Sequence, residues 1–250
     1  MTRSRVPHIL LLYWIIKIAS TTLGETGADM FSMTFEIGYG STILIFLALF
    51  ILLASVKIAM KRYDPALYWL TFTASAIAGT AISDFIDRTL GLGYAAGSML
   101  LLVLLAGVLL LWRAQTRSLS VEQISSVPAE TYYWLAFLIA NTLGTAAGDF
   151  LADDLQIGFM YSALLIGGVL TLTALLHYVT TLSPILLFWI AFILTRPFGA
   201  TFGDLLTKSA DDGGVAFGTI GASLVFTLML GIALFFEIRR ERAYIPEERA

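Results

Sequence analysis

One stretch of sequence decides the fold, because it occurs four times. The copies are YWIIKIASTTLGETGADMF (residues 13–31), YWLTFTASAIAGTAISDFI (68–86), YWLAFLIANTLGTAAGDFL (133–151) and FWIAFILTRPFGATFGDLL (188–206). They align without gaps: each begins with an aromatic residue and a tryptophan, followed by nine residues, a glycine, four residues and an aspartate. A second glycine follows after eight more residues. This register indicates an internal repeat, which is the signature of a repeat architecture.

The repeated positions carry the same residue in every copy. The motif glycines are Gly24, Gly79, Gly144 and Gly199, the motif aspartates are Asp29, Asp84, Asp149 and Asp204, and the closing glycines are Gly38, Gly93, Gly158 and Gly213. The second half of the chain repeats the first at an offset of 120 residues, so that the first two aspartates become the last two.

The composition around these segments is that of a membrane protein. Of 250 residues, 58% are hydrophobic and 13% are charged, with a mean hydropathy of +0.84, whereas soluble domains carry roughly 25% charged residues. Apolar runs such as 43–54, 99–112 and 224–236, with their flanks, reach the ~20 residues that cross a bilayer. Cysteine is absent, which excludes disulfides and thiolate metal sites.

Each repeat predicts a motif helix, a glycine-containing turn and a plainer apolar helix. The predicted spans are 8–30, 40–60, 66–88, 94–113, 131–152, 158–179, 184–207 and 215–238. The predicted fold is therefore an all-α polytopic membrane protein with eight transmembrane helices, formed by four parallel two-helix repeats. Residues 1–113 form the first half, 114–130 a polar cytoplasmic linker, and 131–250 the second half.

The first predicted span begins like a signal peptide, with basic residues before an apolar run, MTRSRVPHILLLYWIIK. Lys17 interrupts that run, and the segment matches three later segments that cannot be signals. We therefore expect it to be the first membrane helix, with a cleaved leader as the alternative.

Basic residues predict the orientation of the helices. Two helices per repeat return the chain to its starting side, so the four motif helices run parallel. Only Arg88 and Lys208 lie on one predicted side, against eleven bases on the other, which by the positive-inside rule is cytoplasmic and holds both termini. The eleven are Arg3, Arg5, Lys57, Lys61, Arg62, Arg113, Arg117, Arg239, Arg240, Arg242 and Arg249.

The two kinds of helix predict an inner bundle and an outer layer. The motif helices hold most charges and small residues, whereas the others are nearly all apolar and suited to lipid. Four residues after each motif glycine comes another small residue, a spacing that lets helix backbones pack closely in membranes. We interpret Gly24, Gly79, Gly144 and Gly199 as packing residues.

The repeated aspartates are the candidate ligands. Residues four and eight positions before each aspartate share its helix face, and many of them are polar. Carboxylates that converge are the hard oxygen ligands of divalent cations. The predicted metal ligands are Asp29, Asp84, Asp149, Asp204 and Glu25. The alternative is that each aspartate bonds backbone amides at a helix end and only shapes the turn.

Three charges break the fourfold pattern: Lys17, Glu25 and Arg196. Charges within a membrane span are costly and mark a functional site by default. We predict that Glu25 exchanges a proton or cation while Lys17 and Arg196 tune its pKa. A purely structural cluster of buried ion pairs is the alternative.

The segments KIASTTLGETGADMFSMTFEIGYG, GTAISDFIDRTLGLGY, GTAAGDFLADDLQIGF and ILTRPFGATFGDLLTK resemble a family of uncharacterised bacterial inner-membrane proteins named "membrane-anchored protein". TTLGET and LTRPFGATFGD are its most specific segments, and the likeness spans nearly the whole chain. The resemblance implies a bacterial inner-membrane location and no particular activity or ligand.

The leading functional hypothesis is a transporter or channel for a cation, most plausibly a divalent metal such as Mn²⁺, which would be its substrate and not a permanent cofactor. The alternatives are a non-transporting structural or assembly protein, and a proton-coupled exporter of another solute. An intramembrane enzyme ranks last, because no recognisable catalytic set accompanies the acids. We expect lipid and an inorganic cation or proton as partners, no nucleic acid, and allow for a homo-oligomer.

Overall fold

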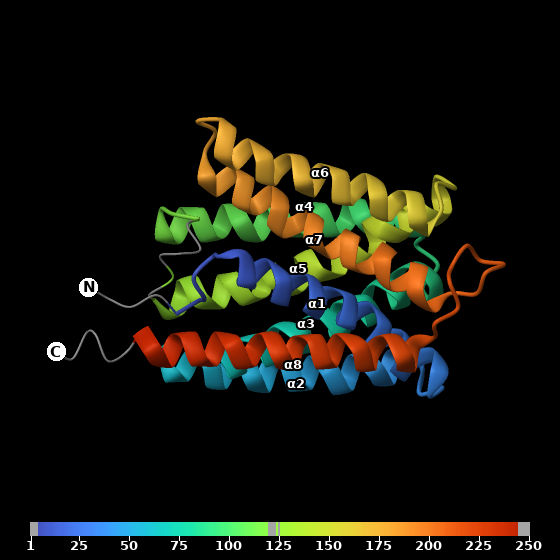
Figure 1. Ribbon diagram of the computed structural model, residues 1–250, viewed down its shortest axis with the longest axis horizontal. Coiled ribbons are helices and arrows are strands. Elements are labelled where there is room, and N and C mark those ends of the chain that lie inside the picture. The colour runs from blue at the N-terminus through green and yellow to red at the C-terminus, as the bar shows by residue number, and fades with distance from the viewer. Residues whose placement is uncertain (1–4, 120–123, 125, 245–250) are drawn as a thin grey trace.

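The computed structural model describes residues 5–119, 124 and 126–244 (Figure 1). Within these residues the chain is all α-helical and has no strand. The helices are α1 (Leu11–Asp29), α2 (Gly38–Met60), α3 (Pro65–Asp84), α4 (Tyr94–Thr116), α5 (Val127–Asp149), α6 (Phe159–Val179), α7 (Pro184–Thr207) and α8 (Thr219–Tyr244).

Three of the motif helices begin with a proline in the first turn, after a capping side chain. Asp64, Ser126 and Ser183 accept a hydrogen bond from the backbone N–H three residues ahead, at the starts of α3, α5 and α7. A cap satisfies one of the free amides of the first turn, and proline removes another without strain. These local signals fix where the helices start.

The motif helices do not end at the aspartate. In the first three repeats, the chain continues as a five-residue π-helix, η1 (Met30–Thr34), η2 (Phe85–Thr89) and η4 (Phe150–Asp154). Backbone bonds five residues apart close each of them, as from Phe35 N to Met30 O at 2.8 Å. In the fourth repeat, α7 ends at Thr207 and a loop follows. The sequence did not predict these π-turns, which are frequent at functional sites.

The four closing glycines all adopt positive φ angles, between 75° and 81°. A positive φ is strained for a residue with a Cβ atom and costs glycine little. The predicted glycine turns are therefore present, and they start the helix or loop that leads back across the bundle.

Seven of the helices in the described part of the chain are long and apolar enough to cross a membrane. The exception is α1, which carries Lys17, Glu25 and Asp29 within 19 residues. All three side chains are buried inside the bundle, so they need not face lipid. The chain is thus a multi-pass membrane protein. A search by hydropathy and charge alone does not identify α1 as a membrane helix, because it does not take the burial of these charges into account.

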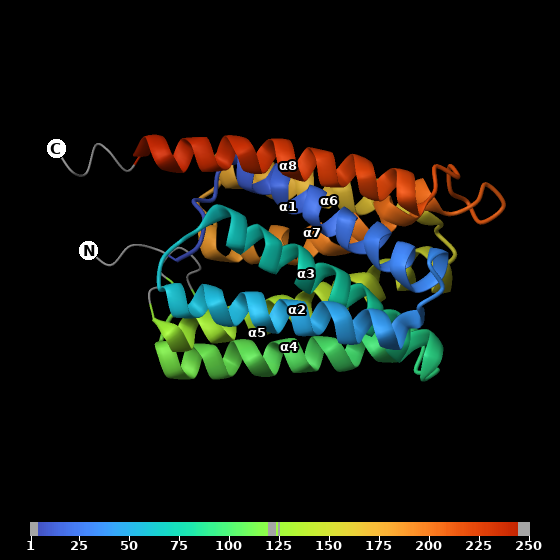
Figure 2. The ribbon, with the colours of Figure 1, turned by 90° about the horizontal axis from the view of Figure 1, so that it is seen from below.

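The motif helices α1, α3, α5 and α7 form a closed inner ring, in which α1 and α5 each contact both α3 and α7. Each remaining helix packs on the motif helix of the following repeat: α2 on α3, α4 on α5, α6 on α7 and α8 on α1. Figures 1 and 2 show the inner four between the outer helices. In their most apolar stretches, 78%, 67% and 44% of residues are buried in α3, α5 and α7, against 22–28% in the outer helices.

The motif glycines lie where the inner helices touch. A Cβ atom on Gly79 would come within 2.9 Å of Asn141 Cβ, and one on Gly24 within 2.6 Å of Ala76 Cβ. Gly144 lies against Arg196 in the same way. A Cβ atom on Gly199 would come within 2.6 Å of Thr21 Oγ1. In every case the neighbour is eight residues before the aspartate of the next repeat, and the fourth repeat closes on the first. The same contact is thus repeated around the ring.

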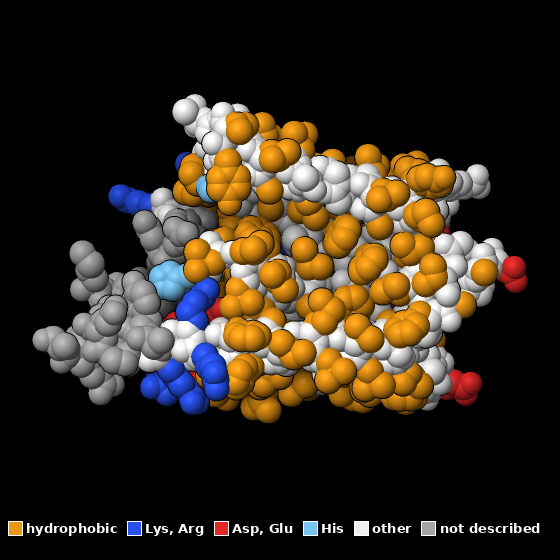
Figure 3. Space-filling model, in the orientation of Figure 1, with side chains coloured by type: hydrophobic (Ala, Val, Ile, Leu, Met, Phe, Trp, Pro, Cys, Tyr) orange, Lys and Arg blue, Asp and Glu red, His pale blue; other side chains and the backbone are white. Residues whose placement is uncertain are grey.

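The surface between the two ends of the bundle is apolar. Figure 3 shows hydrophobic side chains over this belt, with Lys and Arg gathered at one end and Asp and Glu at the other. The first described residues and the end of α8 lie at the basic end (Figure 1). Arg3 and Arg249, two of the bases that predict the orientation, lie outside the described residues.

Some predicted boundaries need correction. Helix α4 continues to Thr116 and α5 starts at Val127, so both helices extend into the segment 114–130 that was predicted as linker. Residues 120–123 and 125 of that segment lie outside the described part. Helix α8 runs from Thr219 to Tyr244, later at both ends than the predicted 215–238, because the loop after α7 is longer than the corresponding turns.

Candidate cation site on the bundle axis

The four motif aspartates are buried at the acidic end of the inner ring, each at most 2% exposed. They fall into two pairs, and each pair holds one base. Lys208 Nζ lies 2.9 Å from Asp29 Oδ2 and 3.2 Å from Asp204 Oδ1. The first aspartate and the last, far apart in sequence, thus meet where the ring closes.

Arg88 joins the other pair in the same way. Its Nε lies 3.4 Å from Asp84 Oδ1, and its Nη2 lies 3.5 Å from Asp149 Oδ2. The Nε also donates a hydrogen bond of 2.9 Å to the Tyr94 hydroxyl. The aspartates therefore form two ion-paired groups, each across the interface of two inner helices.

The aspartates do not cap turns in the structure. Within the described residues, no backbone amide donates a hydrogen bond to any of the four carboxylates, and none of the π-helices that follow is capped by the aspartate before it. The alternative in which the aspartates only shape turns therefore lacks its expected bonds. Several buried carboxylate oxygens accept no hydrogen bond among these residues: Asp84 Oδ1, Asp149 Oδ1 and Oδ2, and Asp204 Oδ1.

One turn deeper in the bundle, Glu25 lies among polar groups of the other three motif helices. Its Oε2 accepts hydrogen bonds of 3.2 Å from both terminal nitrogens of Arg196. Thr80 and Thr145 donate to the same oxygen at 3.2 and 3.4 Å. The glutamate and the two threonines are all four residues before a motif aspartate, as the predicted polar stripe requires.

Arg196 is the centre of this layer. Its Nη2 also donates to Thr145 Oγ1 at 2.7 Å and to Thr80 Oγ1, and its Nη1 donates to the backbone oxygen of Thr21 at 3.4 Å. The buried guanidinium thus connects all four inner helices. The predicted pairing of Arg196 with Glu25 is present.

Three carboxylates come together near the ring closure. Glu25, Asp29 and Asp204 each offer an oxygen, and these oxygens lie within 4.8 Å of one another. Oxygens at such separations can share one ion with bonds of roughly 2.0–2.6 Å. Of the five predicted ligands, these three form one group; Asp84 and Asp149 lie with Arg88 instead.

Lys17 does not join the acids. Its Nζ lies 3.6 Å from the ring centroid of Phe192, 5.0 Å from that of Phe72 and 5.3 Å from that of Phe137. These are the equivalent positions of the other three repeats, twelve residues before each aspartate. No carboxylate of the described residues forms an ion pair with Lys17, so the predicted neutralisation of Glu25 falls to Arg196 alone.

The basic end of the bundle holds a second buried ion-pair group. Glu130 accepts from Arg5 Nη1 at 3.0 Å and from Lys57 Nζ at 2.9 Å, and Lys57 also donates to the backbone oxygen of Arg5. Lys57 is fully buried. Lys57 therefore ties the amino-terminal segment to α2 and α5.

Sequence reasoning missed Arg88 and Lys208 as members of the site. Each lies four residues after a motif aspartate, which is the spacing of an ion pair on a helix. That spacing could have revealed them. Burial alone would lower the pKa of Lys208, but the carboxylates of Asp204 and Asp29 raise it above its usual value, so its ammonium stays charged.

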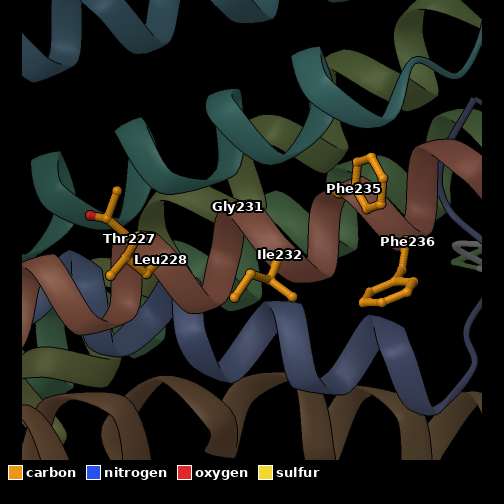
Figure 4. Close-up of a pocket in the computed structure, with 6 residues that line it drawn as sticks. All are labelled: Thr227, Leu228, Gly231, Ile232, Phe235 and Phe236. Carbon is orange, nitrogen blue, oxygen red and sulfur yellow. The ribbon is translucent and has the colours of Figure 1, made fainter.

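A depression on the outer face of α8 is of a different kind. It is lined by apolar side chains and one threonine: Thr227, Leu228, Gly231, Ile232, Phe235 and Phe236 (Figure 4). No ionisable group lines it. It belongs to the apolar belt and has no part in the acidic site.

Comparison with known protein families supports the internal repeat. Residues 12–63, 67–118, 132–183 and 187–243 each match the model of one family, described as a repeat of unknown function, DUF347. No curated protein and no solved structure matches the chain. The matched segments take in all four helix pairs, and the chain belongs to the DUF347 repeat family.

Proposed function

We propose that the protein is an integral membrane transporter or channel for a divalent metal cation such as Mn²⁺. The observation that carries the proposal is the meeting of Glu25, Asp29 and Asp204, three buried carboxylates with oxygens within 4.8 Å of one another. Buried acids in a membrane bundle are costly and mark ion pathways.

The position of the site supports transport over passive binding. The acids lie at one end of the inner ring, and polar side chains continue inward from them through Glu25 to Arg196. The acidic end also attracts cations from solution, since charge of one sign raises their local concentration. A cation that enters there meets successive oxygen ligands on the axis.

We also propose that the membrane is a bacterial inner membrane, with both ends of the chain in the cytoplasm. The gathering of Lys and Arg at the end where α8 finishes supports this orientation (Figure 3). The chain lacks cysteine, so single cysteines can test it. A cysteine at Ala210 should react with an impermeant maleimide in intact cells, and one at Arg117 only after permeabilisation.

Flux into proteoliposomes tests the transport proposal. The wild type should carry Mn²⁺ above empty vesicles, and Asp29→Asn and Asp204→Asn should lower the flux at least about tenfold, a loss of about 1.4 kcal/mol. Asp154→Asn is the matched control, because Asp154 is an exposed acid at the same end. Flux equal to empty vesicles for every divalent ion and for protons contradicts the proposal.

A structural role is the second candidate, and the ion pairs favour it. Lys208 and Arg88 already partly neutralise all four aspartates, as a non-transporting scaffold requires. In that case Asp29→Asn lowers the amount of folded protein, whereas a transport ligand lowers flux with the protein level unchanged.

A further inference from the structure

Lys208 and Arg88 occupy equivalent places in the two halves of the molecule. They are 120 residues apart, which is the offset of the halves. Each base pairs with the aspartate four residues before it and with the aspartate of the next repeat: Arg88 with Asp84 and Asp149, and Lys208 with Asp204 and Asp29. The inner ring thus contains two copies of one arrangement, a base held between two buried acids.

The two bases are held with different strength. Arg88 lies inside the π-helix η2, donates to the Tyr94 hydroxyl and lies 5.8 Å from the centroid of its ring. Lys208 follows the last residue of α7 in an extended backbone conformation. Within the described residues, Asp29 and Asp204 are its side-chain partners. Release of the Lys208 side chain therefore breaks its contacts with two carboxylates, whereas release of Arg88 also breaks its hydrogen bond and ring contact with Tyr94.

The two sites also differ in their number of acids. Glu25 joins Asp29 and Asp204 at the lysine site, whereas the equivalent residue at the arginine site is Thr145. The three acids carry a formal charge of minus three. Arg196, which pairs with Glu25, and Lys208 together carry plus two, so the net charge is minus one. A divalent cation in place of the lysine brings that sum to zero, while a monovalent cation does not change it.

One carboxylate oxygen of the lysine site has an ion pair but no hydrogen bond. Asp204 Oδ1 lies 3.2 Å from the lysine amine, yet it accepts no hydrogen bond although the residue is 1% exposed. The ammonium therefore hydrogen-bonds Asp29 well and Asp204 poorly, so it does not use all the acceptor oxygens of the site.

We propose that Lys208 is a tethered cation that a divalent metal ion displaces from Glu25, Asp29 and Asp204, whereas Arg88 is a fixed counterion at the equivalent site. The inference rests on the proposed function and names the group that competes with its substrate. Lys208 is 20% exposed in its side chain, so the ammonium has a short way to solution.

Binding of Mn²⁺ to the purified protein in detergent tests the displacement, with free Mn²⁺ measured by its paramagnetic resonance signal. Lys208→Met removes the competitor, so the dissociation constant should fall about tenfold or more. Lys208→Arg should raise it, because a guanidinium binds two carboxylates with its planar fork. Arg88→Lys is the matched control and should leave Mn²⁺ affinity within about twofold, because Arg88 pairs with Asp84 and Asp149 and with none of the three proposed ligands.

A second measurement needs no variant. The lysine amines of the wild type are acylated with and without Mn²⁺, and the modified peptides are quantified by mass spectrometry. Mn²⁺ should increase modification at Lys208 and leave the exposed Lys61 unchanged. Constant or reduced modification at Lys208 at saturating Mn²⁺ overturns the displacement.

The outcomes separate the two proposals. If Lys208→Met binds Mn²⁺ more tightly but no variant carries it across vesicles, displacement stands and transport fails. If the wild type transports Mn²⁺ but Lys208→Met binds it no better, transport stands and displacement fails. If neither protein binds Mn²⁺ or any other divalent cation, displacement fails and transport of a divalent metal fails with it.

Discussion

Lys17 takes the place that phenylalanine has in the other three repeats, and its ammonium lies against those three rings. A cation over an aromatic face gains about 2 kcal/mol when desolvated, which is less than the several kcal/mol that removing an ammonium from water costs. The contact therefore offsets only part of the cost of burying this charge.

Two substitutions separate the charge of Lys17 from its volume. Lys17→Met keeps the volume and removes the buried charge, so stability should stay equal or rise. Lys17→Ala leaves a cavity between the rings and should cost about 2 kcal/mol or more. Thermal unfolding in detergent measures both. If Lys17→Met loses as much stability as Lys17→Ala, the charge itself stabilises the packing of the inner helices.

Glu25 and Arg196 form a buried ion pair, so the effect of replacing one depends on the other. Glu25→Gln leaves a buried guanidinium without its carboxylate and should destabilise the protein by about 3 kcal/mol. Arg196→Gln should do so for the opposite reason. The double variant should be more stable than the sum of the two losses predicts, by about 1–3 kcal/mol. Additive losses in a thermal unfolding cycle mean that the two side chains act separately.

At the scale of the helix, the motif glycines decide how closely the inner helices approach. A methyl group on Gly79 meets Asn141 Cβ at 2.9 Å and the backbone of Thr142 at 3.0 Å, so the helices must separate. Gly79→Ala should therefore cost about 1–3 kcal/mol. Gly107 in α4 has open space around it, and Gly107→Ala should be neutral or stabilising, because alanine favours helix. Equal unfolding midpoints for the two variants contradict this assignment.

The sequence predicts some elements well for physical reasons. The closing glycines act locally, as do the N-cap residues and the prolines of the first helical turn. The turns and helix starts therefore follow from a few residues each. The π-turns after Asp29, Asp84 and Asp149 do not, because bonds between residues five apart leave no pattern of polar and apolar residues. The candidate ligands could be found from the repeat, but the separation of Asp84 and Asp149 from Glu25 depends on which helices are neighbours.

At the scale of the whole molecule, the contacts close a circle. Helix α8 packs on α1 as α2 packs on α3, and Gly199 lies against Thr21 as Gly24 lies against Ala76. The last repeat is thus joined to the first by the same contacts that join successive repeats. Since the lysine site of Asp29 and Asp204 lies at this junction, the site exists only when the ring is closed.

A closed ring has no required starting point, and circular permutation tests this. The end of α8 and the first described residues lie at the same end of the bundle as the segment between α4 and α5 (Figure 1). A protein opened between Leu119 and Ile124, with its present ends joined by a flexible linker, keeps the contacts between helices and should unfold at a temperature near that of the parent. It should also keep its Mn²⁺ affinity, because Asp29 and Asp204 then lie in neighbouring repeats of one continuous segment. A permutant that fails to fold, while the same linker appended to the parent chain is harmless, shows that the order of the repeats matters and that the circle is not closed by equivalent contacts.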